Sequence, residues 1–184
     1  MSDIFILPKH PKHYPQQRDY KSCGLFSIKA IIETKHSDMN HVSGYYASSR
    51  FHEKIRISLW SHLMKSLRKH TIKANFGICT QESTEQAINF LKNKIKEGPV
   101  LITIAHSYDK KTQFSLRRTV FFWHHMTVWG YDDTKRVFYC YDSHTDVKME
   151  GLPVGNIALD YDKLMIYRKL CGLGLFGGRY IATK

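Results

Sequence analysis

Apolar side chains recur at helical spacing in three stretches of the chain. The pattern predicts a helix that begins at Cys23, a second over 51–70 and a third over 81–97. Ser22 and Ser83 are of the residue types that cap helix N-termini. The inward-facing residues are Leu25, Ile28, Ile31 and Ile32 in the first helix, Leu59, Leu63, Met64 and Leu67 in the second, and Ala87, Ile88, Leu91 and Ile95 in the third.

Strand patterns dominate the second half of the chain. Apolar and β-branched residues over 100–105, 119–131 and 136–141 predict three strands. The polar run over 132–135 supplies a turn that would join the last two as a hairpin. Two further apolar pieces follow, over 163–170 and 175–182. Because helices come first and strands afterwards, the order predicts an α+β fold.

The N-terminal segment differs from the rest. Pro8, Pro11 and Pro15 predict that residues 1–21 form an extended, mostly irregular segment. The whole chain has 184 residues, which is the size of one compact domain, so we expect a single domain over 1–184. A hydrophobic fraction of 42% is sufficient for a buried core and excludes a disordered protein.

No apolar run approaches the ~18–20 residues that cross a bilayer, so we expect no membrane span. The first residues also lack the basic start of a secretory signal peptide. Four cysteines, at positions 23, 79, 140 and 171, show no paired spacing that would indicate a zinc site or a disulfide framework. We therefore expect free thiols, no metal, and a protein that is cytoplasmic or exported without a cleavable signal peptide.

The chain carries 28 basic and 16 acidic residues, a formal net charge of +12 with histidine neutral. Such a surplus attracts acidic polypeptides, nucleic acid or anionic lipid. The basic residues are scattered, however, and no dense basic run or nucleic-acid-binding motif is present. The charge thus favours a solvated basic surface or an acidic partner over nucleic acid.

Cys23 is the candidate nucleophile. The thiolate is the reactive form of cysteine, and a helix N-terminus or a neighbouring imidazolium stabilises it. Cys23 is predicted at such a helix N-terminus, where small neighbours would let a substrate carbonyl approach the sulfur. A tetrahedral intermediate also needs hydrogen-bond donors, which the side-chain amide of Gln17 and the backbone N–H of Cys23 would supply. Cys79, Cys140 and Cys171 are interpreted as structural, because free cysteine is commonly buried.

The predicted hairpin carries a base and an acid. His124 and His125 lie on its first strand, and Asp142 follows its second. Antiparallel pairing would bring Asp142 close to one of the histidines, where a carboxylate can hold an imidazole in one tautomer. Because adjacent side chains of a strand point to opposite faces, only one of the two histidines can face the thiol.

These residues stand in a recognisable order. Gln17 lies six positions before the Cys-Gly pair at Cys23, His124 lies six positions before Gly130, and the following strand ends in Asp142. In these motifs the sequence resembles the papain-like cysteine peptidase superfamily, and most of all its C39-type, bacteriocin-processing branch and the stand-alone relatives of that branch. The resemblance favours His124 over His125 as the base.

The resemblance implies a papain-like fold, in which N-terminal helices pack on an antiparallel sheet, and a Cys-His-Asp triad. Cys23 would attack a peptide or amide carbonyl, His124 would transfer the proton, Asp142 would orient His124, and Gln17 would help to hold the oxyanion. The substrate would be a polypeptide or acyl group, with an acidic one favoured by the charge, and no cofactor would be needed. Two alternatives stay open: an acyltransferase or transglutaminase-like enzyme that uses the same thioester, and a non-enzymatic basic binding module with a structural cysteine.

Overall fold

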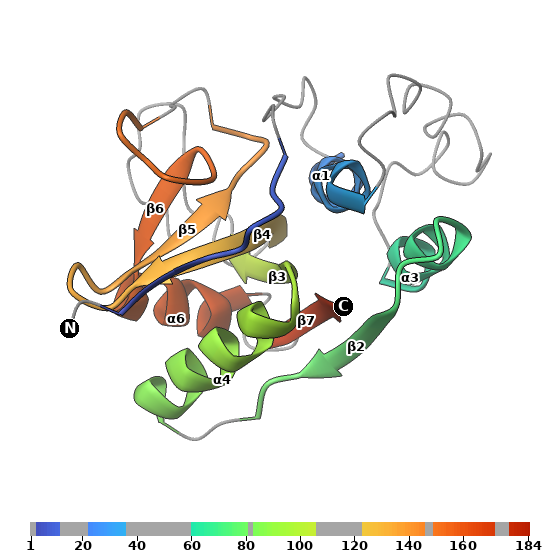
Figure 1. Ribbon diagram of the computed structural model, residues 1–184. Coiled ribbons are helices and arrows are strands. Elements are labelled where there is room, and N and C mark those ends of the chain that lie inside the picture. The colour runs from blue at the N-terminus through green and yellow to red at the C-terminus, as the bar shows by residue number, and fades with distance from the viewer. Residues whose placement is uncertain are drawn as a thin grey trace.

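Antiparallel strands form a central sheet, with helices on both of its faces (Figure 1). The computed structural model describes residues 3–11, 22–35, 60–80, 83–105, 123–145, 149–171 and 177–184. The strands in these ranges are β1 (Ile4–Ile6), β2 (Ala74–Ile78), β3 (Val100–Ala105), β4 (Trp123–Asp132), β5 (Val137–Tyr141), β6 (Ile157–Asp160) and β7 (Arg179–Thr183). The helices are α1 (Cys23–Lys35), α3 (Trp60–Lys69), α4 (Thr84–Glu97) and α6 (Tyr161–Leu170). The predicted α+β class is confirmed.

The sheet has the order β2-β7-β3-β4-β5-β6, with β1 added to β4. β3 pairs with the first part of β4, up to Val128, and β1 pairs with its last part, from Gly130 to Asp132. At Gly130 the backbone of β1 comes so close that an added Cβ would lie 2.5 Å from the carbonyl oxygen of Phe5. The N-terminal segment, predicted as extended, is thus a sheet strand at its start.

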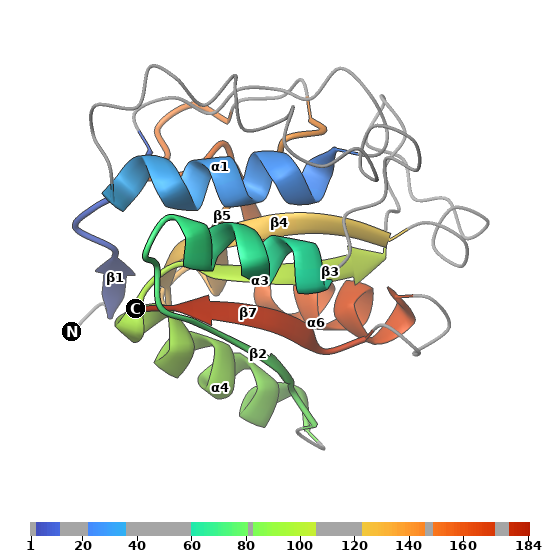
Figure 2. The ribbon, with the colours of Figure 1, turned by 90° about the vertical axis from the view of Figure 1, so that its right-hand side faces the viewer.

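Among the described helices, α1 and α3 lie on one side of the sheet, and α4 and α6 lie on the other (Figure 2). α1 packs against β4. Three of its predicted inward residues, Ile28, Ile31 and Ile32, are fully buried, whereas Leu25 is only half-buried. In α3 the predicted residues Leu63, Met64 and Leu67 are buried.

α4 shows how closely local sequence signals set an element. Its N-cap is Ser83, whose Oγ accepts a hydrogen bond from the backbone N–H of Gln86, while the Gln86 side chain accepts one from the backbone N–H of Ser83. This reciprocal pair satisfies two backbone donors that a helix leaves unpaired. The helix ends before Gly98 and Pro99, as predicted.

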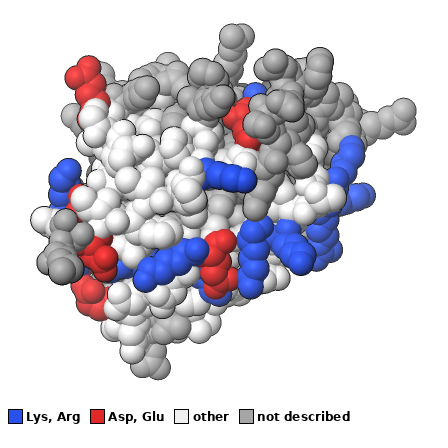
Figure 3. Space-filling model, in the orientation of Figure 1, with Lys and Arg blue, Asp and Glu red and all other residues white. Residues whose placement is uncertain are grey.

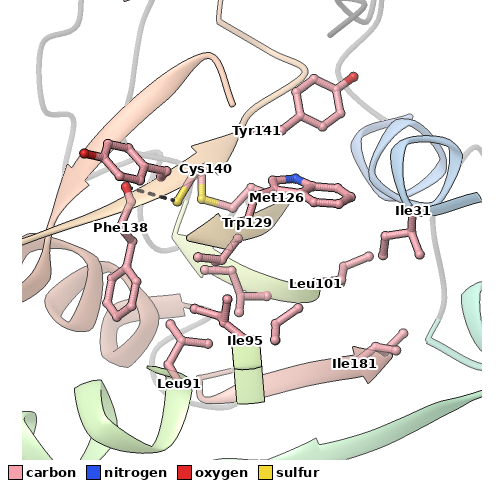
Figure 4. Close-up of a cluster of buried hydrophobic side chains, with 14 of the residues drawn as sticks. Ile31, Leu91, Ile95, Leu101, Met126, Trp129, Phe138, Cys140, Tyr141 and Ile181 are labelled. Carbon is pink, nitrogen blue, oxygen red and sulfur yellow. Dashed lines mark hydrogen bonds between the residues drawn. The ribbon is translucent and has the colours of Figure 1, made fainter. Parts of the chain in front are cut away.

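The core lies between the helices and the sheet (Figure 4). Trp129 of β4 and Tyr141 of β5 are among the largest side chains with no exposed surface. The buried indole N–H of Trp129 has a hydrogen-bond partner, because it donates to Thr127 Oγ1 at 2.7 Å. Burying such aromatic groups contributes about 2–3 kcal/mol each, which fixes β4 and β5 against the helices.

The hairpin of β4 and β5 forms as the sequence predicts. Thr127 is the partner of Tyr141, and the register shifts between Val128 and Gly130, where β4 carries one extra residue. Asp142 therefore follows the last paired residue of β5 and lies beside the early part of β4. This register brings Asp142 to the histidines.

Some elements were missed or lie outside the described residues. The edge strand β2 was not predicted, because its apolar residues Phe76 and Ile78 are exposed and give no inward stripe. The short strand β6 was also missed. The predicted starts of the second helix (51–59) and of the histidine strand (119–122) fall in ranges that the structure does not describe. Within the described ranges, no helix is both long enough and apolar enough to cross a membrane.

Candidate active site

Cys23 is the first residue of α1 and lies against β4. Its Sγ accepts a hydrogen bond of 3.4 Å from the backbone N–H of His125. One turn further along α1, the Ser27 hydroxyl donates a hydrogen bond of 3.3 Å to the backbone carbonyl oxygen of His125. These two contacts fix the N-terminal turn of α1 against β4, and they give the sulfur an N–H donor in addition to the positive end of the helix. Cys23 is buried, with 6% of its surface exposed.

His124 lies between Cys23 and Asp142. Its Nε2 is 2.7 Å from Asp142 Oδ1, and both residues are buried. Burial alone would lower the pKa of His124, but the charges of Asp142 and Cys23 and its hydrogen bonds with both raise it to about 10. Since Nε2 is engaged by Asp142, Nδ1 is the ring nitrogen left for the sulfur. The arrangement favours an imidazolium over a wide pH range.

Asp142 is itself held from two directions. Its Oδ1 accepts a second hydrogen bond, of 2.8 Å, from the backbone N–H of His144. The side-chain amide of Asn156 binds its main chain, with Oδ1 accepting from the Asp142 N–H at 2.8 Å and Nδ2 donating to the Asp142 carbonyl oxygen at 2.7 Å. Because Asp142 has little freedom, the ring of His124 is oriented in turn.

The neighbouring His125 has different partners. Its Nδ1 lies 3.1 Å from Thr103 Oγ1, and its ring meets the Trp60 ring edge-on with centroids 4.9 Å apart. His125 thus contacts Cys23 through its backbone, whereas His124 contacts Asp142 through its ring. This difference agrees with the alternation expected along a strand.

The structure thus brings together Cys23, His124 and Asp142, three of the four residues that the sequence singled out. Gln17 lies outside the described residues. Asn156 was missed, because an asparagine 14 positions beyond the acid in the sequence gives no signal before the β5–β6 pairing is known. Among the described residues, no group of three or more His, Cys, Asp or Glu side chains could hold a metal ion.

Two of the other cysteines show the features of structural residues. Cys140 and Cys171 are fully buried. Burial raises the pKa of the Cys140 thiol, with Asp142 adding to the effect, and burial also raises the pKa of the Cys171 thiol, where the charge of Arg179 opposes it. Neither thiol is prepared to ionise at neutral pH.

Comparisons with known proteins identify the fold. No protein-family model and no curated protein matches the chain. Among solved structures, it is similar to a double-glycine motif protease from an AMS/PCAT transporter, solved in complex with the leader peptide, with a TM-score of 0.57 at 13% identity over 98% of this chain and 97% of that one. It is also similar to the peptidase domain of Streptococcus ComA, a bifunctional ABC transporter involved in quorum sensing, with a TM-score of 0.55 at 14% identity over 93% of this chain and 98% of that one. The chain therefore has the fold of C39-type, papain-like peptidase domains, as its sequence motifs implied.

Proposed function

We propose that this chain is a single-domain cysteine peptidase, or a related thiol hydrolase, that cleaves peptide or amide bonds. The observation that carries the proposal is the contact of the buried His124 with both Asp142 and Cys23. Acyl transfer by a cysteine nucleophile requires a thiol, an imidazole that contacts it and a carboxylate that orients the imidazole. The three residues make these contacts in this order, with the thiol at a helix N-terminus. The fold shared with two peptidase domains supports the same reading.

In the first half of the reaction, the Cys23 thiolate attacks the substrate carbonyl and forms a tetrahedral intermediate. The backbone N–H of Cys23 and the side chain of Gln17 donate hydrogen bonds to the oxyanion. The His124 imidazolium then gives a proton to the leaving amine, and the C–N bond breaks to leave a thioester on Cys23. In the second half, His124 takes a proton from water, which attacks the thioester and releases the acid.

The ground state of this reaction is the ion pair of Cys23 and His124. The His125 N–H and the N-terminus of α1 both favour the anionic sulfur. Asp142 favours the cationic ring, in keeping with the raised pKa of His124. The protein thus has the nucleophile and the proton donor ready in the same pair of residues, and no metal or organic cofactor enters any step.

A polypeptide is the substrate class that we propose. The AMS/PCAT protease is a double-glycine motif protease that binds a leader peptide, so a peptide that contains a double glycine is the first substrate to test. The net charge of +12 favours acidic residues in that peptide. On the face shown in Figure 3, basic side chains are most abundant towards the side where α3 lies, and the last turn of α3 contains Arg68 and Lys69.

Alkylation of Cys23 tests the ion pair without a known substrate. Iodoacetamide labelling would be followed by peptide mapping between about pH 5 and pH 9, and each variant would be compared with wild type at Cys23 itself, because this residue is only 6% exposed. We expect His124→Gln to slow labelling at about pH 6 by at least ~10-fold and to shift the rate profile towards that of an ordinary thiol. His62→Gln, a half-buried histidine of α3, is the matched control and should leave the profile unchanged.

Two outcomes would contradict the proposal in different ways. If His124→Gln and Asp142→Asn label like wild type, Cys23 is not activated and the enzyme assignment fails. If His125→Gln removes the enhanced labelling while His124→Gln does not, the base is misassigned. With a cleavable double-glycine peptide, Cys23→Ser should abolish turnover and His124→Gln should lower kcat/KM by ~100-fold or more.

A further inference from the structure

Arg168 carries a buried positive charge with which no carboxylate of the described residues pairs. It lies in the last turn of α6 and is only 3% exposed. A buried guanidinium is costly unless an anion pairs with it. In the described part of the chain no carboxylate lies within ion-pair distance of Arg168, and its Nε has no hydrogen-bond partner there. Within the described ranges, the site therefore offers no carboxylate to balance the guanidinium.

The contacts that Arg168 does make lead to Cys79, the residue after β2. Nη2 of Arg168 donates to the carbonyl oxygen of Gly178 at 3.1 Å, and the backbone N–H of Cys79 donates to the same oxygen at 2.9 Å. Gly178, with a φ of +71°, approaches so closely that a Cβ there would lie 2.6 Å from the Cys79 carbonyl oxygen. The guanidinium and the cysteine thus meet at one carbonyl group.

The side chains also interact. Burial lowers the pKa of Arg168, while the charge of Cys79, a hydrogen bond with Cys79 and the charge of Tyr180 oppose that effect. The remaining contact of the guanidinium, from Nη1 to Met165 Sδ at 3.8 Å, is to an uncharged sulfur. Of these neighbours Cys79 is the side chain that can act as a nucleophile, and it shares a hydrogen bond with the guanidinium.

We propose that Cys79 is a second reactive thiol, activated by Arg168, and that it forms mixed disulfides with small disulfides that carry carboxylates. Reactive cysteines are found in electropositive, partly exposed surroundings, and Cys79 is half-buried beside a guanidinium with which no carboxylate of the described residues pairs. Cys140 and Cys171 are fully buried. The sequence pattern gave no reason to separate Cys79 from these two.

The chemistry is thiol–disulfide exchange. The Cys79 thiolate attacks one sulfur of the small disulfide, a new S–S bond forms as the old one breaks, and the other half leaves as a thiolate that takes a proton from solvent. The disulfide is reduced as Cys79 is oxidised, so no other oxidant is needed. Once Cys79 is capped, a carboxylate on the bound half pairs with the Arg168 guanidinium, which favours anionic reagents over neutral ones.

The test uses the Cys23→Ala chain, so that its result does not depend on the proposed peptidase activity. Dithiobis(nitrobenzoate), a dicarboxylate disulfide, should label one thiol rapidly, and peptide mapping should place the label on Cys79. Cys79→Ala in this background should remove the rapid phase. An uncharged disulfide, bis(hydroxyethyl) disulfide, should show a smaller preference for Cys79 over Cys171.

Substitution of the arginine tests its role directly. Arg168→Met should slow labelling of Cys79 by ~10-fold or more, whereas Lys169→Met, which removes an exposed charge from the next position of the same helix, should change it less than ~2-fold. Arg168→Lys keeps a cation and should retain most of the rate. Equal rates in Arg168→Met and Lys169→Met would overturn the proposal. If Arg168→Met does not fold, the Cys23→Ala chain alone decides. The proposal is overturned if Cys79 in that chain reacts no faster than Cys171, or if Cys79 shows no preference for the dicarboxylate reagent.

Discussion

Asn156 holds the main chain of Asp142 with both ends of its side-chain amide. The two hydrogen bonds measure 2.8 and 2.7 Å, and both residues are buried. Asn156 is held in place by its own backbone, because its N–H donates to the carbonyl oxygen of Cys140 and its carbonyl accepts from Met149, each at 2.9 Å. Substitution of this one side chain should therefore affect both the stability of the fold and the position of the carboxylate.

The expected loss of stability follows from the backbone groups that the substitution of Asn156 leaves without a hydrogen-bond partner. Asn156→Ala removes the partners of the N–H and the C=O of Asp142, which is only 5% exposed. Each unsatisfied buried polar group costs about 1–3 kcal/mol, so we expect a loss of about 3 kcal/mol in the free energy of unfolding. For a protein of this size, that loss corresponds to a decrease of about 6–12 °C in Tm. Asn156→Asp should not restore stability, because the oxygen that replaces Nδ2 cannot donate to the Asp142 carbonyl.

Urea unfolding measures the effect as a shift of the midpoint at constant slope. The matched control is Asn93→Ala, at an exposed position of α4, which should change the free energy of unfolding by less than about 0.5 kcal/mol. In folded Asn156→Ala, labelling of Cys23 by iodoacetamide should also lose part of its rate at low pH, because His124 is less firmly oriented. A midpoint as little shifted as that of Asn93→Ala would refute the reasoning on stability. An unchanged labelling profile would refute the positioning role of Asn156.

Two further predictions concern charge. His124 should contribute stability that is fully present below about pH 6.5 and is lost as the pH rises towards about 10, because folded His124 retains a proton that the unfolded chain releases. His124→Gln should therefore flatten the difference between urea midpoints at about pH 6 and about pH 9, and a difference equal to that of wild type would contradict the raised pKa. Lys92 lies 2.7 Å from both oxygens of Asp133 and is largely buried. Lys92→Met should therefore lower the free energy of unfolding, measured by heat or urea, by about 1–2 kcal/mol. Lys94→Met, which breaks a more exposed pair, should lower it by less than about 0.5 kcal/mol. Equal losses in the two lysine variants would show that burial does not strengthen the first pair.

Features set by neighbouring residues were predictable from the sequence. The capping box of α4 depends on Ser83 and Gln86, three positions apart, and the hairpin that carries His124 and Asp142 depends on two strand patterns joined by a polar turn. In both cases a local signal, a cap residue or a turn between two strand patterns, predicts which residues meet. The position of Cys23 at the start of α1 followed in the same way, from small residues before an apolar helical face.

Features that depend on strand pairing without a local turn signal were not predictable. Asn156 reaches Asp142 only because β6 pairs with β5, and Cys79 meets Arg168 only because β7 brings Gly178 beside the end of β2. β2 itself was missed, because an edge strand with exposed apolar residues lacks the alternation that marks a half-buried strand. Sequence motifs thus indicate which residues carry the proposed reaction, while the groups that hold or activate those residues come from the sheet topology. For this reason the substitutions that best separate the chemistry from the scaffold are at Asn156 and Arg168, whose roles are defined only by contacts across the sheet.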